Sequence, residues 1–125
     1  MKIAILEDDD MKALVANNAI EAVFPSACSS IKRFETLCEL EQCHEKFNVL
    51  VSDLNLPDSP GSSTAEFLKK QCKTLADFIV IFSTDANLSE AISQTDLTQF
   101  SYWTVADNLA GLLSNLPIMS DRWSA

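Results

Sequence analysis

Apolar residues along this chain gather in short runs, separated by longer stretches in which they recur at the spacing of a helix. The clearest run is Phe78–Phe82, five strongly apolar residues of the kind found in a parallel strand that is buried on both faces. Lys2–Leu6 and Phe47–Val51 have the same character, and weaker strands are expected at Cys28–Phe34 and Gln99–Trp103. The pattern therefore predicts five short strands.

Helical spacing occupies most of the chain between these runs. Apolar residues recur at Met11, Leu14, Val15, Ala19, Ala22 and Val23 until Pro25 ends the pattern. Further helices are predicted from Leu37 to Glu45, around Phe67, Leu68 and Cys72 with Ser63 or Thr64 as the capping residue, from Leu88 to Ile92, and from Leu109 to Leu116.

Regular alternation of strands and helices predicts an α/β fold, in which a parallel sheet is covered by helices on both faces and linked by right-handed crossovers. In open sheets of this kind the functional site lies beyond the carboxyl ends of the strands, where the strand order reverses. The residues that directly follow each strand are therefore the ones to examine.

The chain has 125 residues, 47% of them hydrophobic, which suits one compact domain. We expect this domain to cover residues 1–118, and 119–125 to be a tail or the start of a linker to an output domain. The net charge of −9 argues against direct binding to nucleic acid or to an anionic membrane. No apolar run approaches the ~20 residues of a membrane span, and the N-terminus lacks the features of a signal peptide, so a cytoplasmic location is expected.

Polar groups follow three of the predicted strands. Glu7 and Asp8 come after the first, Asp53 after the third, and Ser83 and Thr84 after the fourth. If the first and third strands are neighbours, three carboxylates meet in one pocket, where they raise one another's pKa unless a cation binds. Oxygen ligands without histidine or cysteine suit a hard ion such as Mg²⁺.

These motifs resemble the receiver domain of bacterial two-component response regulators over residues 2 to about 116. The acidic pair of the family corresponds to Glu7 and Asp8 in Ile5-Leu6-Glu7-Asp8-Asp9, and its phosphoacceptor to Asp53 in Val49-Leu50-Val51-Ser52-Asp53-Leu54-Asn55-Leu56-Pro57. Pro57 and Gly61 fit the usual proline and glycine of the following loop. The resemblance implies a flavodoxin-like (βα)5 three-layer sandwich with strand order 2-1-3-4-5.

The resemblance also implies a function. Asp53 would accept a phosphoryl group from a histidine kinase or a phosphotransfer protein, and Mg²⁺ would be held by Glu7, Asp8, Asp53 and the backbone carbonyl of Asn55. Ser83, with Thr84 beside it, would bond to the phosphoryl group and switch the conformation, which would be read by an output domain or a homodimer.

One residue of the family pattern is missing. Receivers place a lysine at the end of the fifth strand, whereas this chain has Tyr102 there and no lysine after Lys73. A tyrosine hydroxyl donates a hydrogen bond but carries no positive charge. The sequence therefore indicates an atypical receiver with weak or altered switching.

Two other functions remain open. The missing lysine favours a pseudo-receiver, a module that binds a partner or its own copy without phosphorylation. A phosphatase with an aspartyl nucleophile is the other, although that chemistry usually needs a second aspartate two positions later, where this chain has Asn55. Asp9 and Asp10 are interpreted as the N-terminus of a helix, with Asp9 a possible outer ligand of the metal.

Overall fold

A computed structural model of the chain describes residues 1–25, 30–82, 100–103 and 109–116, with side chains described for all of these except 100–103. One parallel sheet has the strand order β2-β1-β3-β4-β5, as the resemblance implies. Its strands are β1 (Ile3–Leu6), β2 (Ile31–Phe34), β3 (Phe47–Ser52), β4 (Ala76–Phe82) and β5 (Phe100–Trp103). The predicted α/β fold with a doubly wound parallel sheet is confirmed.

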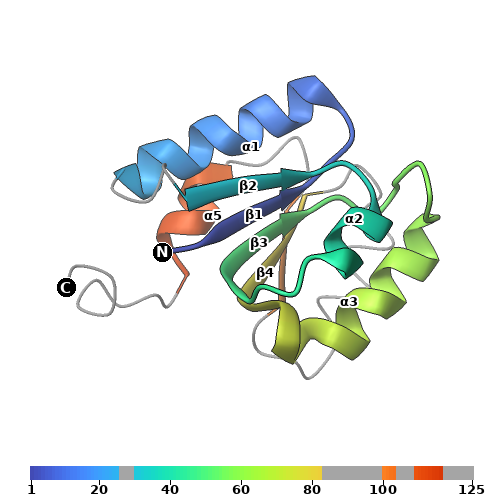
Figure 1. The fold of residues 1–125 in the computed structure, drawn as a ribbon. Coiled ribbons are helices and arrows are strands. Elements are labelled where there is room, and N and C mark those ends of the chain that lie inside the picture. Colours follow the sequence, from blue (N-terminus) through green and yellow to red (C-terminus); the bar gives the residue numbers. More distant parts are fainter. Residues whose placement is uncertain (26–29, 83–99, 104–108, 117–125) are drawn as a thin grey trace.

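Helices lie on both faces of this sheet (Figure 1). Helices α1 (Asp10–Val23) and α5 (Leu109–Ser114) pack on one face, and α2 (Leu37–Gln42) and α3 (Gly61–Leu75) pack on the other. Successive residues of a strand point to opposite faces. Ile3 and Ile5 of β1 accordingly join the core under α1 and α5, whereas Ala4 and Leu6 join the core under α2 and α3. The unbroken apolar runs in the sequence follow from this two-sided burial.

Helix α1 forms where it was predicted, but several residues that defined its spacing do not face the sheet. Met11, Leu14 and Val15 are 68%, 52% and 48% exposed. The buried positions are Ala13, Ala16 and Ile20. Two of these three are alanines, and such small side chains allow a helix backbone to lie close to the sheet. The apolar spacing alone therefore identified only part of the buried face, since Ala19 and Val23 pack against the core whereas Met11, Leu14 and Val15 are exposed.

Helix α3 begins earlier than the predicted capping residues. Its N-cap is Pro60 rather than Ser63 or Thr64, and that proline makes no side-chain capping bond. Thr64 is instead buried in the first turn, where its hydroxyl donates to the Ser59 hydroxyl at 2.8 Å or to the Pro60 carbonyl at 3.2 Å. A threonine that bonds back to the preceding turn behaves as a helical residue, which is why the prediction was wrong.

The other boundaries differ by a few residues. Helix α2 ends at Gln42, before the predicted Glu45, and β4 begins at Ala76, directly after α3. The start of the strand predicted from Cys28, the helix predicted at 88–92 and the tail at 119–125 lie outside the described residues. Within the described ranges, none of the helices has the length and apolar character needed to cross a membrane.

Two positions on α1 test the assignment of its buried face. Ile20→Ala should lower the free energy of unfolding by about 2–5 kcal/mol, because it leaves a cavity at a fully buried site. Leu14→Ala, the matched exposed substitution, should change it by less than about 0.5 kcal/mol. Urea unfolding followed by circular dichroism measures both. Equal losses would contradict the orientation of α1.

Candidate functional site

The pairing of β1 with β3 brings the acidic residues together. Leu6 pairs with Ser52 at the last position of the two strands, so Glu7 and Asp53 follow side by side. Two hydrogen bonds fix these exits: the Asp53 N–H donates to the Leu6 carbonyl at 2.9 Å, and the Glu7 N–H donates to the Phe34 carbonyl of β2 at 2.9 Å. The parallel register, more than any local turn, therefore places Glu7 and Asp53 side by side although they are 46 positions apart in the sequence.

Three carboxylates meet at this edge of the sheet, as predicted. Glu7, Asp8 and Asp53 each contribute one oxygen to a group whose oxygens lie within 4.8 Å of one another. Glu7 and Asp53 are buried, at 2% and 5% exposed, whereas Asp8 is exposed. Two of the three carboxylates therefore lie inside the protein, and the third lies on the side of the cluster that is open to solvent.

The charged form of Glu7 is disfavoured in this group. Its pKa is raised to about 8, first by burial and next by the negative charge of Asp53. The Asp9 N–H, which donates to Glu7 Oε2 at 3.2 Å, and the ammonium of Lys12 partly oppose this rise. Its other oxygen, Oε1, is buried without a hydrogen-bond partner. The side chain therefore presents an unsatisfied acceptor to the centre of the cluster.

This arrangement fits a hard divalent cation. Mg²⁺ binds carboxylate and carbonyl oxygens at about 2.1 Å, so that two of its ligand oxygens lie at most about 4.2 Å apart. Small side-chain movements would close the group of oxygens to that size. The unpartnered Oε1 of Glu7 is the kind of buried atom that a metal ion satisfies.

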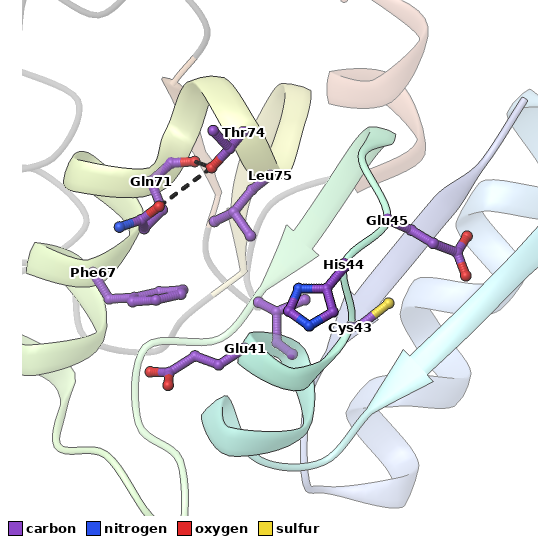
Figure 2. A pocket seen from close by; sticks show the side chains of 9 residues that line it. Glu41, Cys43, His44, Glu45, Phe67, Gln71, Thr74 and Leu75 are labelled. Carbon is purple, nitrogen blue, oxygen red and sulfur yellow. Dashed lines mark hydrogen bonds between the residues drawn. The ribbon is translucent and has the colours of Figure 1, made fainter.

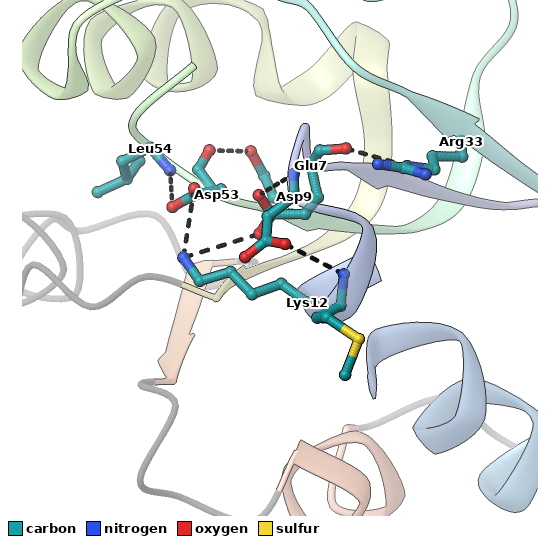
Figure 3. Close-up of polar contacts among 8 residues, drawn as sticks. Glu7, Asp9, Lys12, Arg33, Asp53 and Leu54 are labelled. Atoms are coloured by element: carbon teal, nitrogen blue, oxygen red, sulfur yellow. Dashed lines mark hydrogen bonds and ion pairs between the residues drawn. The ribbon is translucent and has the colours of Figure 1, made fainter. Parts of the chain in front are cut away.

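Two basic residues that the sequence reasoning did not single out line the site (Figure 3). The Lys12 Nζ of α1 lies 3.6 Å from Asp53 Oδ2 and 3.9 Å from Glu7 Oε1. Arg33 of β2 donates from Nε to the Glu7 backbone carbonyl at 3.0 Å and from Nη1 to Asp10 Oδ1 at 2.9 Å. Arg33 thereby holds the turn between β1 and α1, and Lys12 brings a positive charge to the acids.

Asp9 and Asp10 have the structural roles expected for them. Asp9 is the N-cap of α1, and its Oδ1 accepts a hydrogen bond from the Met11 N–H at 3.1 Å. Asp10 lies in the first turn and pairs with Arg33. The helix therefore starts directly behind the acidic pair, and Lys12 of its first turn reaches Glu7 and Asp53.

The loop after β3 is held by its own polar groups. The Leu54 N–H donates to Asp53 Oδ1 at 2.7 Å, and Asn55 Oδ1 accepts from the Gly61 N–H at 3.1 Å. Farther along, the two carboxylate oxygens of Asp58 accept from the first two amides of α2, Leu37 and Cys38, each at 2.9 Å. These bonds lower the pKa of Asp58. The loop that begins with Asp53 is thus attached to α2 as well as to α3.

The geometry does not test the roles predicted for three positions. Ser83 and Thr84 lie outside the described residues. Tyr102 lies in β5, paired with Ile81 of β4 one residue before the strand ends, and its side chain is not described. Their roles stay predictions.

A cavity of about 470 Å³ lies away from the acidic cluster. It is formed between the connection from α2 to β3 and the last turns of α3, with His44, Phe67 and Gln71 among its lining residues (Figure 2). That connection and the end of α3 lead into the starts of β3 and β4. The cavity therefore belongs to the amino edge of the sheet, opposite to the candidate site.

Comparisons with known proteins identify the fold. No family model and no curated protein matches the chain. Among solved structures, RcsB from Salmonella enterica serovar Typhimurium, bound to the promoter rprA with phosphomimetic BeF3⁻, matches with a TM-score of 0.69 at 15% identity, covering 90% of this chain and 93% of that one. The BeF3-activated receiver domain of DrrB, from Thermotoga maritima, matches with a TM-score of 0.66 at 20% identity and 90% coverage of both chains.

A sensor protein from Polaromonas sp. JS666 matches with a TM-score of 0.61 at 25% identity, covering 90% of this chain and 89% of that one. RcsB and DrrB are response regulators, and the DrrB match is to its isolated receiver domain. The chain therefore has the fold of a response-regulator receiver domain, as the motifs indicated.

The raised pKa of Glu7 predicts how stability changes with pH when divalent ions are removed by a chelator. Between pH 4.5 and about 8 the folded protein keeps the Glu7 proton that the unfolded chain releases. The free energy of unfolding should therefore fall as pH rises through this window, by up to about 1.4 kcal/mol per pH unit from this group.

Chemical denaturation at several pH values measures this slope. Glu7→Gln should remove its contribution and stabilise the metal-free protein near pH 8, whereas Glu66→Gln, at an exposed position of α3, should leave the slope in place. An identical pH dependence of the wild type and Glu7→Gln would show that Glu7 does not titrate in this range.

Proposed function

We propose that this chain is a phosphoacceptor domain of two-component signalling, in which Asp53 accepts a phosphoryl group from the phosphohistidine of a sensor kinase or a phosphotransfer protein. The observation that carries the proposal is the convergence of Glu7, Asp8 and Asp53 beyond the ends of β1 and β3, with a buried glutamate oxygen left unpartnered. A sheet that only had to fold would gain nothing from crowded, buried carboxylates. The receiver fold of the chain supports the same function.

Asp53 is oriented for such a transfer. Its Oδ1 accepts the Leu54 N–H, so Oδ2, on the side of Glu7 and Lys12, is the oxygen available for attack. The Oδ2–P bond forms as the P–N bond to the donor histidine breaks, and the electron pair of that bond stays on the imidazole nitrogen, which takes up a proton. Asp53 thereby becomes an acyl phosphate.

Mg²⁺ would be held by Glu7, Asp8, Asp53 and the Asn55 backbone carbonyl, and when bound it would neutralise charge on the phosphoryl oxygens. Glu7 has to release its proton to serve as a ligand, since its pKa lies near 8 without metal. Ser83, with Thr84 beside it, would then bond to the phosphoryl group and shift the conformation that an output domain or a second copy reads.

A binding module that works without phosphorylation is the second candidate. It is favoured by the exposed apolar residues Met11, Leu14 and Val15 on α1, beside the site, together with the tyrosine at position 102. Such a module would not depend on Asp53. The experiment on Asp53 therefore separates the two functions.

Incubation with acetyl phosphate and Mg²⁺ should add one phosphoryl group to the wild type, detected by intact-protein mass spectrometry. Asp53→Asn should abolish the addition, because the amide is a far weaker nucleophile, and chelation of Mg²⁺ should reduce the rate at least about a hundredfold. Asp77→Asn, a matched change at the start of β4 on the opposite edge, should react like the wild type. No Asp53-dependent addition, under conditions that phosphorylate an ordinary receiver, would refute the proposal.

A further inference from the structure

Lys12 occupies an unusual place for a lysine. It is the third residue of α1, its side chain is only 22% exposed, and its Nζ lies over the opening between Glu7 and Asp53 (Figure 3). Helical side chains lean toward the N-terminus of their helix, and α1 starts just behind the acidic pair. The local geometry therefore directs this ammonium into the site instead of into solvent, where most lysines lie.

The distances show what kind of contact this is. At 3.6 Å from Asp53 Oδ2 and 3.9 Å from Glu7 Oε1, the ammonium is too far for direct hydrogen bonds, which are about 2.7–3.2 Å long. It compensates negative charge without binding tightly to either oxygen. A cation placed in this way leaves Oδ2 accessible and lies close to any group that becomes attached to it.

The net charge of the site also indicates a role for Lys12. Fully ionised, Glu7, Asp8 and Asp53 contribute three negative charges, and Lys12 reduces the total to −2, which one divalent cation balances. The lysine expected at position 102 would have supplied this single positive charge, and Tyr102 does not. Among the residues that the structure describes, Lys12 is the basic side chain that forms ion pairs with Glu7 and Asp53.

We propose that Lys12 is the phosphoryl-pairing cation of this domain, supplying from α1 the positive charge that receivers otherwise provide from the end of β5. This inference rests on the proposed phosphoacceptor function. As the Oδ2–P bond forms, the Lys12 ammonium passes from the carboxylate oxygen to a phosphoryl oxygen and keeps all its protons. Phosphorylation is thereby sensed at the first turn of α1.

The test compares Lys12→Gln with the wild type for two quantities, the initial rate of phosphorylation by acetyl phosphate in saturating Mg²⁺ and the affinity for Mg²⁺ measured by calorimetry. The rate should fall about ten- to a hundredfold, because one electrostatic contact to the transferred group is lost. The affinity for Mg²⁺ should rise several-fold, because a positive charge beside the metal is removed. A variant that merely folded poorly would show a lower phosphorylation rate and a lower affinity for Mg²⁺.

Three further variants complete the experiment. Lys12→Arg keeps the charge and should recover most of the rate, and Lys70→Gln, at an exposed position of α3, removes the same charge elsewhere and should match the wild type. Tyr102→Phe should lower the phosphorylation rate less than Lys12→Gln does. If Lys12→Gln unfolds, the phosphorylation rates of Lys12→Arg and Lys12→Met are compared instead. Lys12→Arg should react faster, because it keeps the positive charge that Lys12→Met lacks.

The outcomes are distinguishable from those of the proposed function. If the wild type is not phosphorylated on Asp53, the phosphoacceptor function itself fails. If the wild type is phosphorylated and Lys12→Gln reacts at the same rate, or Lys12→Arg is as slow as Lys12→Gln, or Tyr102→Phe has the larger effect, the role of Lys12 is refuted while the function stands.

Discussion

The parallel pairing of β1 with β3 is the constraint on which the rest of this molecule depends. Leu6 and Ser52 are the last pair in the register, and the Asp53 N–H donates to the Leu6 carbonyl, so Glu7 and Asp53 emerge side by side at the same edge of the sheet. A shift of one residue in this register would turn the side chains of the shifted strand to its opposite face. The apolar residues under the two helical layers prevent such a shift, and the core thereby fixes the distance between Glu7 and Asp53.

Burial of the acids at that point is costly. The raised pKa of Glu7 shows this cost, because its side chain enters the interior beside a second carboxylate. The Asp9 amide and the Lys12 ammonium offset part of this cost, whereas Arg33 bonds to the backbone carbonyl of Glu7 and not to its carboxylate. An under-compensated cluster of this kind has a strong tendency to take up a cation.

Much of this could be predicted from the sequence, because the strands are buried on both faces and their apolar runs are unambiguous. The convergence of Glu7, Asp8 and Asp53 was expected if the first and third strands are neighbours, an order that the resemblance to receiver domains implied. The orientation of α1 could not be read from its apolar residues, since alanines at positions 13 and 16 face the sheet while larger side chains remain in solvent. Similarly, the start of α3 could not be read from Thr64. Its hydroxyl bonds to the Pro60 carbonyl in the preceding turn, and the residue type does not show whether a threonine does this or caps the helix.

Lys12 was missed for a different reason. The family pattern places its lysine at the end of the fifth strand, where this chain has Tyr102. The signal lay near the first strand: a lysine in the first turn of a helix whose N-cap, Asp9, directly follows the acidic pair. In that position a long side chain points back over the cap, so helix geometry and not motif matching locates it.

The attachment of the β3–α3 loop to α2 has a mechanical consequence. Asp58 holds the first two amides of that helix with both of its oxygens, and the Thr36 hydroxyl caps the next amide, that of Glu39. Displacement of the loop away from α2 would leave two N–H groups without acceptors. The loop and the start of the helix should therefore move together. A displacement of the loop that begins with Asp53 is thereby coupled to α2, at the β2 edge of the sheet.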